Sequence, residues 1–93
     1  MEIQHQFDGK RGSFFMEEAA KRFAEMVYVM AGESKLIIEH TEVDQSLKGQ
    51  GIGEKLLEEL VQYVRSKNIK VIPLCPFAKA TFRKREDLRD VLS

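Results

Sequence analysis

Apolar and polar residues alternate along the first half of the chain, in runs separated by glycine and charged residues. Alternation with a period of two is typical of β-strands that have one buried face. The pattern predicts four strands joined as an antiparallel meander, over Ile3 to Phe7, Gly12 to Glu17, Phe23 to Met30 and Lys35 to Val43. The third run is apolar at both parities, so we expect a central strand that is covered on both faces.

The first of these strands carries its larger side chains at one parity. Ile3, His5 and Phe7 share one face, and Gln4 and Gln6 share the other. We therefore expect this strand to be half buried and His5 to be structural or exposed.

After residue 50 the apolar residues recur with the period of a helix. The stripe predicts an amphipathic helix from about Gln50 to Lys67, followed by Asn68 as a left-handed terminator. We expect its apolar face to cover the sheet. That face consists of Ile52, Leu56, Leu57, Leu60, Val61 and Val64.

Lys70 to Leu74 predicts a short fifth strand. A crossover helix connects it to Lys35–Val43, so the two strands should be parallel. Pro73 has no N–H donor, which places it at an edge or an interrupted pairing position, where the two strands can splay apart. A second helical pattern runs from Phe77 to Arg85. The expected fold is α+β: one domain over residues 1–93, with a mostly antiparallel five-stranded sheet, one parallel pair, a long helix and a shorter C-terminal helix.

Composition and charge narrow the function classes. Of the 93 residues, 43% are hydrophobic and 32% are charged, as in ordinary soluble proteins. The 15 basic and 15 acidic residues leave no net charge, so we expect no nucleic acid partner. No apolar stretch approaches the roughly 18 residues that span a bilayer, so we expect no signal peptide, no membrane segment and a cytoplasmic location. A single cysteine excludes an internal disulfide, and no His/Cys cluster has zinc spacing, so we expect no metal.

Three glycines at alternate positions, Gly49, Gly51 and Gly53, lie between the fourth strand and the long helix. Glycine accepts positive φ and lets the main chain approach a ligand, and the first amides of a helix favour an anion. We therefore expect a phosphate to bind here. The spacing matches neither a P-loop nor the Rossmann fingerprint. The alternative is a tight turn that binds nothing.

Cys75 is the first candidate for chemistry. It precedes Pro76, and proline is favoured at the first position of a helix. Cys75 is therefore expected at the N-cap, where the positive end of the helix stabilises a thiolate and makes the thiol reactive. The alternative is that Cys75 packs as a small apolar residue at the end of a strand.

His40 is the second candidate, because an imidazole exchanges a proton near neutral pH. If no bulge intervenes, it shares a strand face with Leu36 and Ile38, and a hydrogen-bonded core histidine is then the alternative. The expected strand order brings His40 within reach of Cys75.

The segment from Val43 to Leu57 closely resembles the pyrophosphate-binding segment of the GNAT superfamily of acyl-CoA-dependent N-acetyltransferases, whose pattern is Arg/Gln-x-x-Gly-x-Gly/Ala. Lys48 stands at the first defined position, where the superfamily usually has Arg or Gln. The resemblance implies a GNAT-like fold and acetyl-CoA or coenzyme A as the cofactor. The cofactor-binding residues that it implies are Val43, Lys48, Gly49, Gln50, Gly51, Ile52, Gly53, Glu54, Phe77 and Arg83.

For two of these residues, the predicted elements indicate which part of the cofactor they would contact. Val43 ends the fourth strand, whose free edge near the splay would hold the pantetheine arm. Arg83 would contact the ribose phosphate, although a cation there also complements the C-terminus of a helix.

His40 to Val43, the glycine loop and Pro73 to Cys75 together resemble a subgroup of minimal, stand-alone GNAT-like proteins of about this length. The resemblance implies that His40 and Cys75 are the catalytic residues. The tyrosine acid usual in the superfamily is missing, because Phe82 lies about where it would fall. Cys75 would then be the acid for the departing CoA thiolate, or would carry the acetyl group itself.

These observations predict an enzyme that transfers an acetyl group from acetyl-CoA to a primary amine of a protein, peptide or small molecule, with His40 as the base. Two alternatives stay open. One is a CoA- or acyl-CoA-binding module with little or no turnover, which the missing tyrosine favours. The other is an interaction domain that binds no CoA. We expect no membrane partner, and the sequence is compatible with a monomer.

Overall fold

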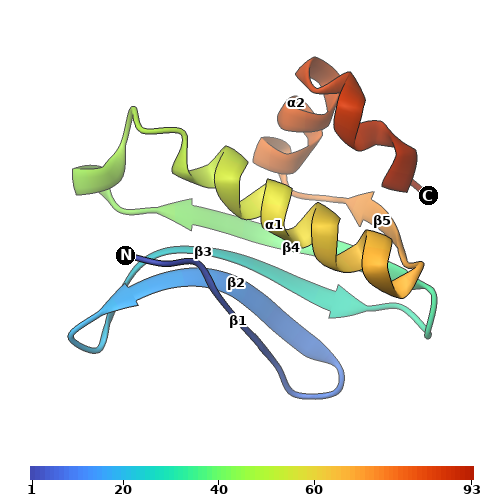
Figure 1. Cartoon of the computed structure of the whole chain (residues 1–93), viewed down its shortest axis with the longest axis horizontal. Coiled ribbons are helices and arrows are strands. Elements are labelled where there is room, and N and C mark those ends of the chain that lie inside the picture. The colour runs from blue at the N-terminus through green and yellow to red at the C-terminus, as the bar shows by residue number, and fades with distance from the viewer.

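The chain forms one five-stranded sheet in a computed structural model that describes residues 1–93 (Figure 1). The strands lie side by side in chain order. The first four pair antiparallel and the fifth pairs parallel to the fourth, which confirms the predicted fold class. The strands are β1 Gln4–Phe7, β2 Arg11–Glu18, β3 Lys21–Met30, β4 Lys35–Val43 and β5 Lys70–Pro73.

Two α-helices and two short 3₁₀ helices complete the chain. They are η1 Gln45–Leu47, α1 Ile52–Lys67, α2 Pro76–Lys84 and η2 Glu86–Val91. Helix α1 begins after Gly51 rather than at Gln50, because Gly51 is the N-cap with a φ of 69°. It ends as predicted at Asn68, whose φ is 60°. No helix of this chain has both the length and the apolar character needed to cross a bilayer.

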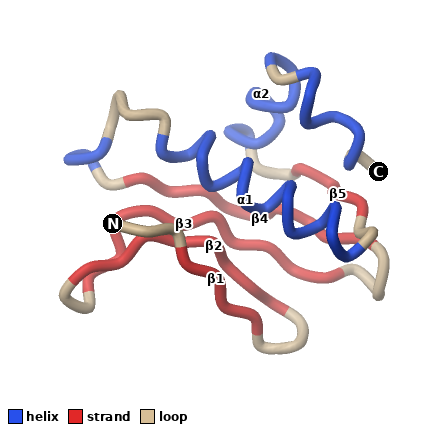
Figure 2. The backbone as a smooth tube through the Cα atoms, viewed as in Figure 1, coloured by secondary structure: helices blue, strands red, loops and turns tan.

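The two α-helices lie on the same face of the sheet (Figure 1). Strands β1 to β4 follow one another through short turns, whereas a longer excursion containing η1 leads from β4 into α1 (Figure 2). Twenty buried residues fill the space between the helices and the sheet as one apolar core. The predicted stripe of α1 forms its helical side, with Leu56, Leu60 and Val64 completely buried.

The second face of the sheet carries no helix (Figure 1). β3 therefore alternates in burial. Ala24, Met26 and Tyr28 are buried on the helical side, whereas Val27 and Val29 on the other side are partly exposed. The prediction that this strand is covered on both faces is wrong: β3 is central in the sheet, but nothing is stacked on its second side.

β1 is exposed along its whole length, so the prediction of a half-buried first strand is also wrong. It is an edge strand, with a neighbour on one side only. His5 nevertheless makes specific contacts: its ring stacks on Phe14 with centroids 4.0 Å apart, and its Nε2 lies 2.6 Å from the Tyr28 hydroxyl. Partial burial lowers the pKa of His5. His5 thus ties the edge strand to the core.

Arg22 covers part of the bare face. Its guanidinium lies 3.8 Å from the centroid of the Phe15 ring, and it donates hydrogen bonds to Ser13 and Gln6 at 3.3 and 3.2 Å. An ion pair of 3.3 Å joins it to Glu17. Phe15 is only 5% exposed although no helix lies over it. One arginine side chain therefore shields an apolar residue on the open side of the sheet.

Candidate functional site

The connection from β4 to α1 places two glycines in the left-handed region. Gly49 has a φ of 82° and Gly51 a φ of 69°, values that residues with a Cβ adopt only with strain. Asp44 opens this connection by accepting hydrogen bonds from the hydroxyl and the amide of Ser46, at 2.6 and 3.0 Å. These two bonds lower the pKa of Asp44. The glycines then turn the chain into α1.

The amide N–H groups of residues 49–54 have no hydrogen-bond partner within the chain. The first bond of the helix is donated by the Lys55 amide to the Gly51 carbonyl, at 3.1 Å. Gly51 has no side chain that could cap the free amides. Together with the positive end of the helix dipole, these amides form a site that favours an anion such as a phosphate.

The third glycine brings the two helices together. A Cβ on Gly53 would lie 2.5 Å from Cζ of Phe77, so the Phe77 ring lies directly on the backbone of α1. Phe77 stands in the first turn of α2 and remains 39% exposed. The absence of a side chain at residue 53 therefore lets the N-termini of α1 and α2 meet beside the loop.

A hollow of about 230 Å³ opens at this meeting point. Most of the predicted cofactor-binding residues line it; Gln50 and Arg83 do not. Two lining residues, Leu47 and Lys84, are missing from the sequence prediction. The full lining is Val43, Leu47, Lys48, Gly49, Gly51, Ile52, Gly53, Glu54, Phe77 and Lys84.

Glu54 places a carboxylate at the rim of this hollow. Lys84 lies 3.1 Å from one of its oxygens and Arg85 lies 2.8 Å from the other. Lys84 and Arg85 together lower the pKa of Glu54, so the carboxylate is charged and doubly paired. The sequence prediction named Arg83 as the cation from this stretch, but Arg83 lines a different hollow with Lys79 and other residues.

β4 and β5 separate before the end of β4, whose last residue, Val43, lines this hollow. They pair only from Lys35 to Ile38 on β4, and Pro73 is the last partner on β5. The amides of Leu74 and Cys75 both donate to the Ile38 carbonyl, at 3.0 and 3.2 Å, as the chain turns into α2. The predicted splay at the proline is confirmed, and residues 39–43 of β4 have no strand partner on this side.

Cys75 is the N-cap of α2, as predicted, and Pro76 is the first helical residue. Its Sγ accepts a hydrogen bond from the Ala78 amide at 3.4 Å. The second partner of Sγ is Thr41, whose hydroxyl lies 3.2 Å away. Cys75 is 5% exposed, so the thiol lies just beneath the surface. Thr41 is a contact that the sequence prediction missed.

His40 does not share a face with Leu36 and Ile38, because a bulge intervenes. Tyr28 on β3 pairs with Ile38 and Val27 pairs with His40, so Glu39 is an extra residue in β4. The bulge reverses the alternation of side chains. His40 therefore points to the bare side of the sheet, where it is 57% exposed and 4.0 Å from Glu42.

Phe82 lies about where the tyrosine acid usual in the superfamily would fall. It is buried in the core at 3% exposure and so brings no hydroxyl to the site. The Cys75 thiol and its Thr41 partner thus lie on the helical side of β4, whereas the His40 imidazole lies on the bare side. The expectation that strand order brings His40 within reach of Cys75 is wrong, because the bulge turns the two side chains to opposite faces.

Both the sequence and the structure of this chain are similar to those of known proteins. A family model described as GCN5-related N-acetyl-transferase matches residues 13–91. A GCN5-like protein from Staphylococcus aureus, solved by NMR, superposes with a TM-score of 0.74 and 30% identity over 97% of this chain and 87% of that one. No curated protein sequence matches the chain.

Two more distant structures share the fold. The ribosomal-protein-S18-alanine N-acetyltransferase of Escherichia coli has 17% identity and a TM-score of 0.67, over 84% of this chain and 53% of that one. A protein from Clostridium acetobutylicum described as a predicted acetyltransferase, solved with acetyl-CoA, has 18% identity and a TM-score of 0.64, over 80% of this chain and 55% of that one. The family model covers most of the chain, including the glycine loop and Cys75. The chain therefore belongs to the GCN5-related N-acetyltransferase family.

Proposed function

We propose that the chain, as one domain over residues 1–93, transfers an acetyl group from acetyl-CoA to a primary amine of a protein, peptide or small molecule. The observation that carries this proposal is the group of free amides at residues 49–54, within the segment that the family model matches. The distant neighbour from Clostridium acetobutylicum was solved with acetyl-CoA, which supports the same cofactor.

The residues around the loop fit coenzyme A. The free amides of residues 49–54 would hold its diphosphate, with Lys48 beside them. The unpartnered edge of β4 near Val43 would hold the pantetheine arm, because an amide-bearing chain can pair with free strand groups. The exposed side chains of Leu74 and Phe77 would give it apolar contact.

Acetyl-CoA supplies an activated thioester, and the chain must remove one proton and deliver another. The amine nitrogen forms a bond to the thioester carbonyl carbon, the carbon–sulfur bond breaks, and the electron pair leaves on the CoA sulfur. In our proposal His40 takes the proton that the amine loses. Cys75, held by Thr41, gives its proton to the departing thiolate.

The bare face of the sheet supports the role that we propose for His40. No helix covers the second face, so an amine can reach His40 from solvent, and acceptors of varied size fit such an open side. The free thiol of Cys75 suits a reducing compartment, so we place the reaction in the cytoplasm.

A CoA-binding module with little or no turnover is the second candidate. Phe82 has no hydroxyl to give a proton, and the Cys75 thiol is 5% exposed, which limits its contact with a substrate. In that case the loop would bind the nucleotide and Cys75 would be a packing residue.

Two measurements decide between these candidates. Titration calorimetry with CoA tests binding, and an acetylation assay over polyamines, lysine peptides and amino sugars tests turnover. We expect the wild-type chain to bind CoA and to acetylate at least one of these amines, and Cys75→Ala to lose acetylation while it keeps CoA affinity. Binding without acetylation of any amine would favour the module, and absence of binding would exclude both.

Intact mass after incubation with acetyl-CoA alone separates two routes. Direct attack by the amine leaves the protein mass unchanged. A covalent route adds one acetyl group, which is absent from Cys75→Ala.

A further inference from the structure

Lys84 reaches from the end of α2 to the first turn of α1. Its Nζ lies 3.1 Å from a Glu54 oxygen, and its side chain is 68% exposed. It lines the loop hollow together with Lys48 and the three glycines. Because its stem is exposed, the ammonium group can move toward a ligand in this hollow without disturbing the core.

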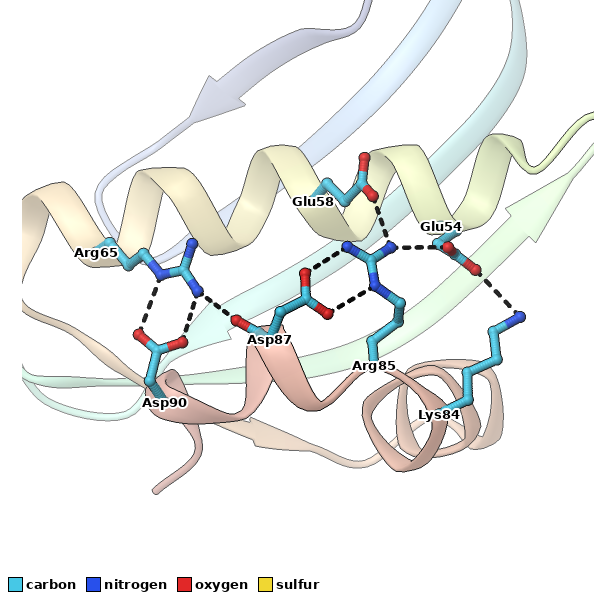
Figure 3. A network of polar contacts seen from close by, with 7 residues as sticks. All are labelled: Glu54, Glu58, Arg65, Lys84, Arg85, Asp87 and Asp90. Carbon is cyan, nitrogen blue, oxygen red and sulfur yellow. Dashed lines mark hydrogen bonds and ion pairs between the residues drawn. The ribbon is translucent and has the colours of Figure 1, made fainter.

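Glu54 does not depend on Lys84 for its charge balance. Arg85 lies 2.8 Å from the second oxygen of Glu54. Arg85 is itself held by Asp87 and Glu58, each at 2.7 Å (Figure 3). These carboxylates raise the pKa of Arg85, which therefore stays charged. If Lys84 moves away, Glu54 still has a cation beside it.

The same geometry creates a competition for Lys84. A phosphate bound to the free amides of residues 49–54 would lie in the hollow that Lys84 lines. A phosphate offers more charged oxygens than the single carboxylate of Glu54, and charge-assisted hydrogen bonds to phosphate are strong. The carboxylate of Glu54 would also repel the phosphate less while Arg85 remains paired with it.

We infer that Lys84 is a phosphate-binding side chain for coenzyme A, and that it rests on Glu54 when no cofactor is bound. This inference rests on the proposed function. Its ligand is a phosphate of the nucleotide, in the diphosphate or at the 3′ position, since both offer the same chemistry to an ammonium group.

Arg83 provides a matched control. It is the neighbour of Lys84 in the last turn of α2 and carries the same charge. It lines a separate hollow with Lys79 and Arg89, away from the loop. Arg83→Gln and Lys84→Gln therefore change the net charge of the chain equally, but only Lys84→Gln removes a cation from the loop hollow.

Titration calorimetry at low salt tests the inference with two ligands, CoA and dephospho-CoA, which lacks the 3′-phosphate. We expect Lys84→Gln to weaken CoA binding about tenfold, the effect of losing one charge-assisted hydrogen bond. Arg83→Gln should change it by no more than about twofold, because an isolated surface charge contributes little.

Comparison of CoA with dephospho-CoA shows which phosphate of the nucleotide Lys84 binds. A loss confined to CoA assigns Lys84 to the 3′-phosphate, and an equal loss for both ligands assigns it to the diphosphate; each result supports the inference. Unchanged affinity in Lys84→Gln, or equal losses in the two variants, overturns it while the proposed function stands. Failure of the wild-type chain to bind CoA overturns both.

Glu54→Gln tests the resting position of Lys84. This variant frees Lys84 and removes a negative charge beside the phosphate, so CoA should bind about threefold more tightly. Unchanged or weaker binding would show that Glu54 does not compete with the cofactor for Lys84, and would overturn that part of the inference.

Discussion

Gly12 lies against the ring of Tyr28, and this contact should make Gly12→Ala destabilising. A Cβ on Gly12 would lie 2.4 Å from both Cζ and Oη of Tyr28, about 1 Å inside normal contact distance. The Tyr28 side chain is fully buried, so its ring has no free space to enter. Its hydroxyl lies 2.6 Å from Nε2 of His5, so a displaced ring would also lose that hydrogen bond.

The expected loss follows from three contributions. Overpacking a core costs about 1–3 kcal/mol, and loss of the Tyr28 hydrogen bond adds about 1 kcal/mol. Replacing glycine by alanine in a strand otherwise stabilises by about 0.5–1 kcal/mol. The free energy of unfolding should therefore fall by about 2 kcal/mol. For a domain of this size, such a loss lowers Tm by about 10–15 °C.

Urea unfolding followed by circular dichroism measures this loss of stability, and two substitutions of Tyr28 isolate its cause. Tyr28→Phe keeps the ring and removes the hydroxyl, so this variant alone should lose about 1 kcal/mol. In a Tyr28→Val background no ring meets the new Cβ, and Gly12→Ala should be neutral or stabilising. If Gly12→Ala is as stable as wild type when Tyr28 is present, the close approach does not constrain residue 12 and the reasoning fails.

Three further stability predictions can be measured by the same unfolding assay. Ala20 has a φ of 67° in the turn between β2 and β3, so Ala20→Gly should stabilise the chain by about 0.5–1 kcal/mol, and a loss would show that the turn is not strained. Arg22→Ala should cost about 1–2 kcal/mol because it uncovers Phe15, and Arg22→Met, which keeps an apolar stem over that ring, should cost less; equal costs would assign the effect to charge alone. Burial lowers the pKa of His5 below its usual 6.5, so the unfolded chain binds the proton more readily, and the free energy of unfolding should fall as the pH drops below 6.5. His5→Gln should make this dependence of stability on pH less steep, and an unchanged dependence would show that His5 does not cause it.

Local chemistry explains what the sequence predicted well. The bounds of β4 agree with the prediction because a turn precedes Lys35 and the glycine loop follows Val43. Cys75 lies at the N-cap because Pro76 favours the first helical position. The stripe on α1 is buried because it is the only apolar face of that helix. Each of these features depends only on residues that are close together in the sequence, so the local pattern is enough to predict it.

The sequence predictions were wrong where the burial of a side chain, or the face of the sheet to which it points, depends on distant parts of the chain. Val27 and Val29 are apolar whether or not a helix lies over them, so the pattern of β3 does not reveal that the second face is bare. The extra residue in β4, Glu39, has no marker such as glycine, and one inserted residue turns every later side chain to the other face. The contact of Thr41 with Cys75 follows from that single bulge.

Arg83, Lys84 and Arg85 illustrate the same limit on a helix. Successive residues of a helix point about 100° apart, so Arg83 and Lys84 at the end of α2 face different directions, and Arg85 follows as the C-cap. Which of them faces the loop depends on how α2 packs on α1, through the contact of Phe77 with Gly53. The sequence prediction named Arg83 as the cation that reaches the cofactor, and only the packing of the helices shows that Lys84 is the one that lines the hollow.

The bulge also bears on how the two candidate catalytic residues can act together. Successive side chains of a strand point to opposite faces, so the contact of Thr41 with Cys75 directs His40 to the bare side. A covalent route would place the acetyl group on a thiol that is 5% exposed and on the far side of the strand from His40, the base in our proposal. Direct attack does not require the acetyl group to reach that thiol. Because the amine nitrogen and the CoA sulfur are bonded to one carbonyl carbon, this carbon would have to lie at the unpaired edge of β4, where groups from both faces can approach it. We therefore propose direct transfer, with Cys75 as the acid and Thr41 as the residue that orients it.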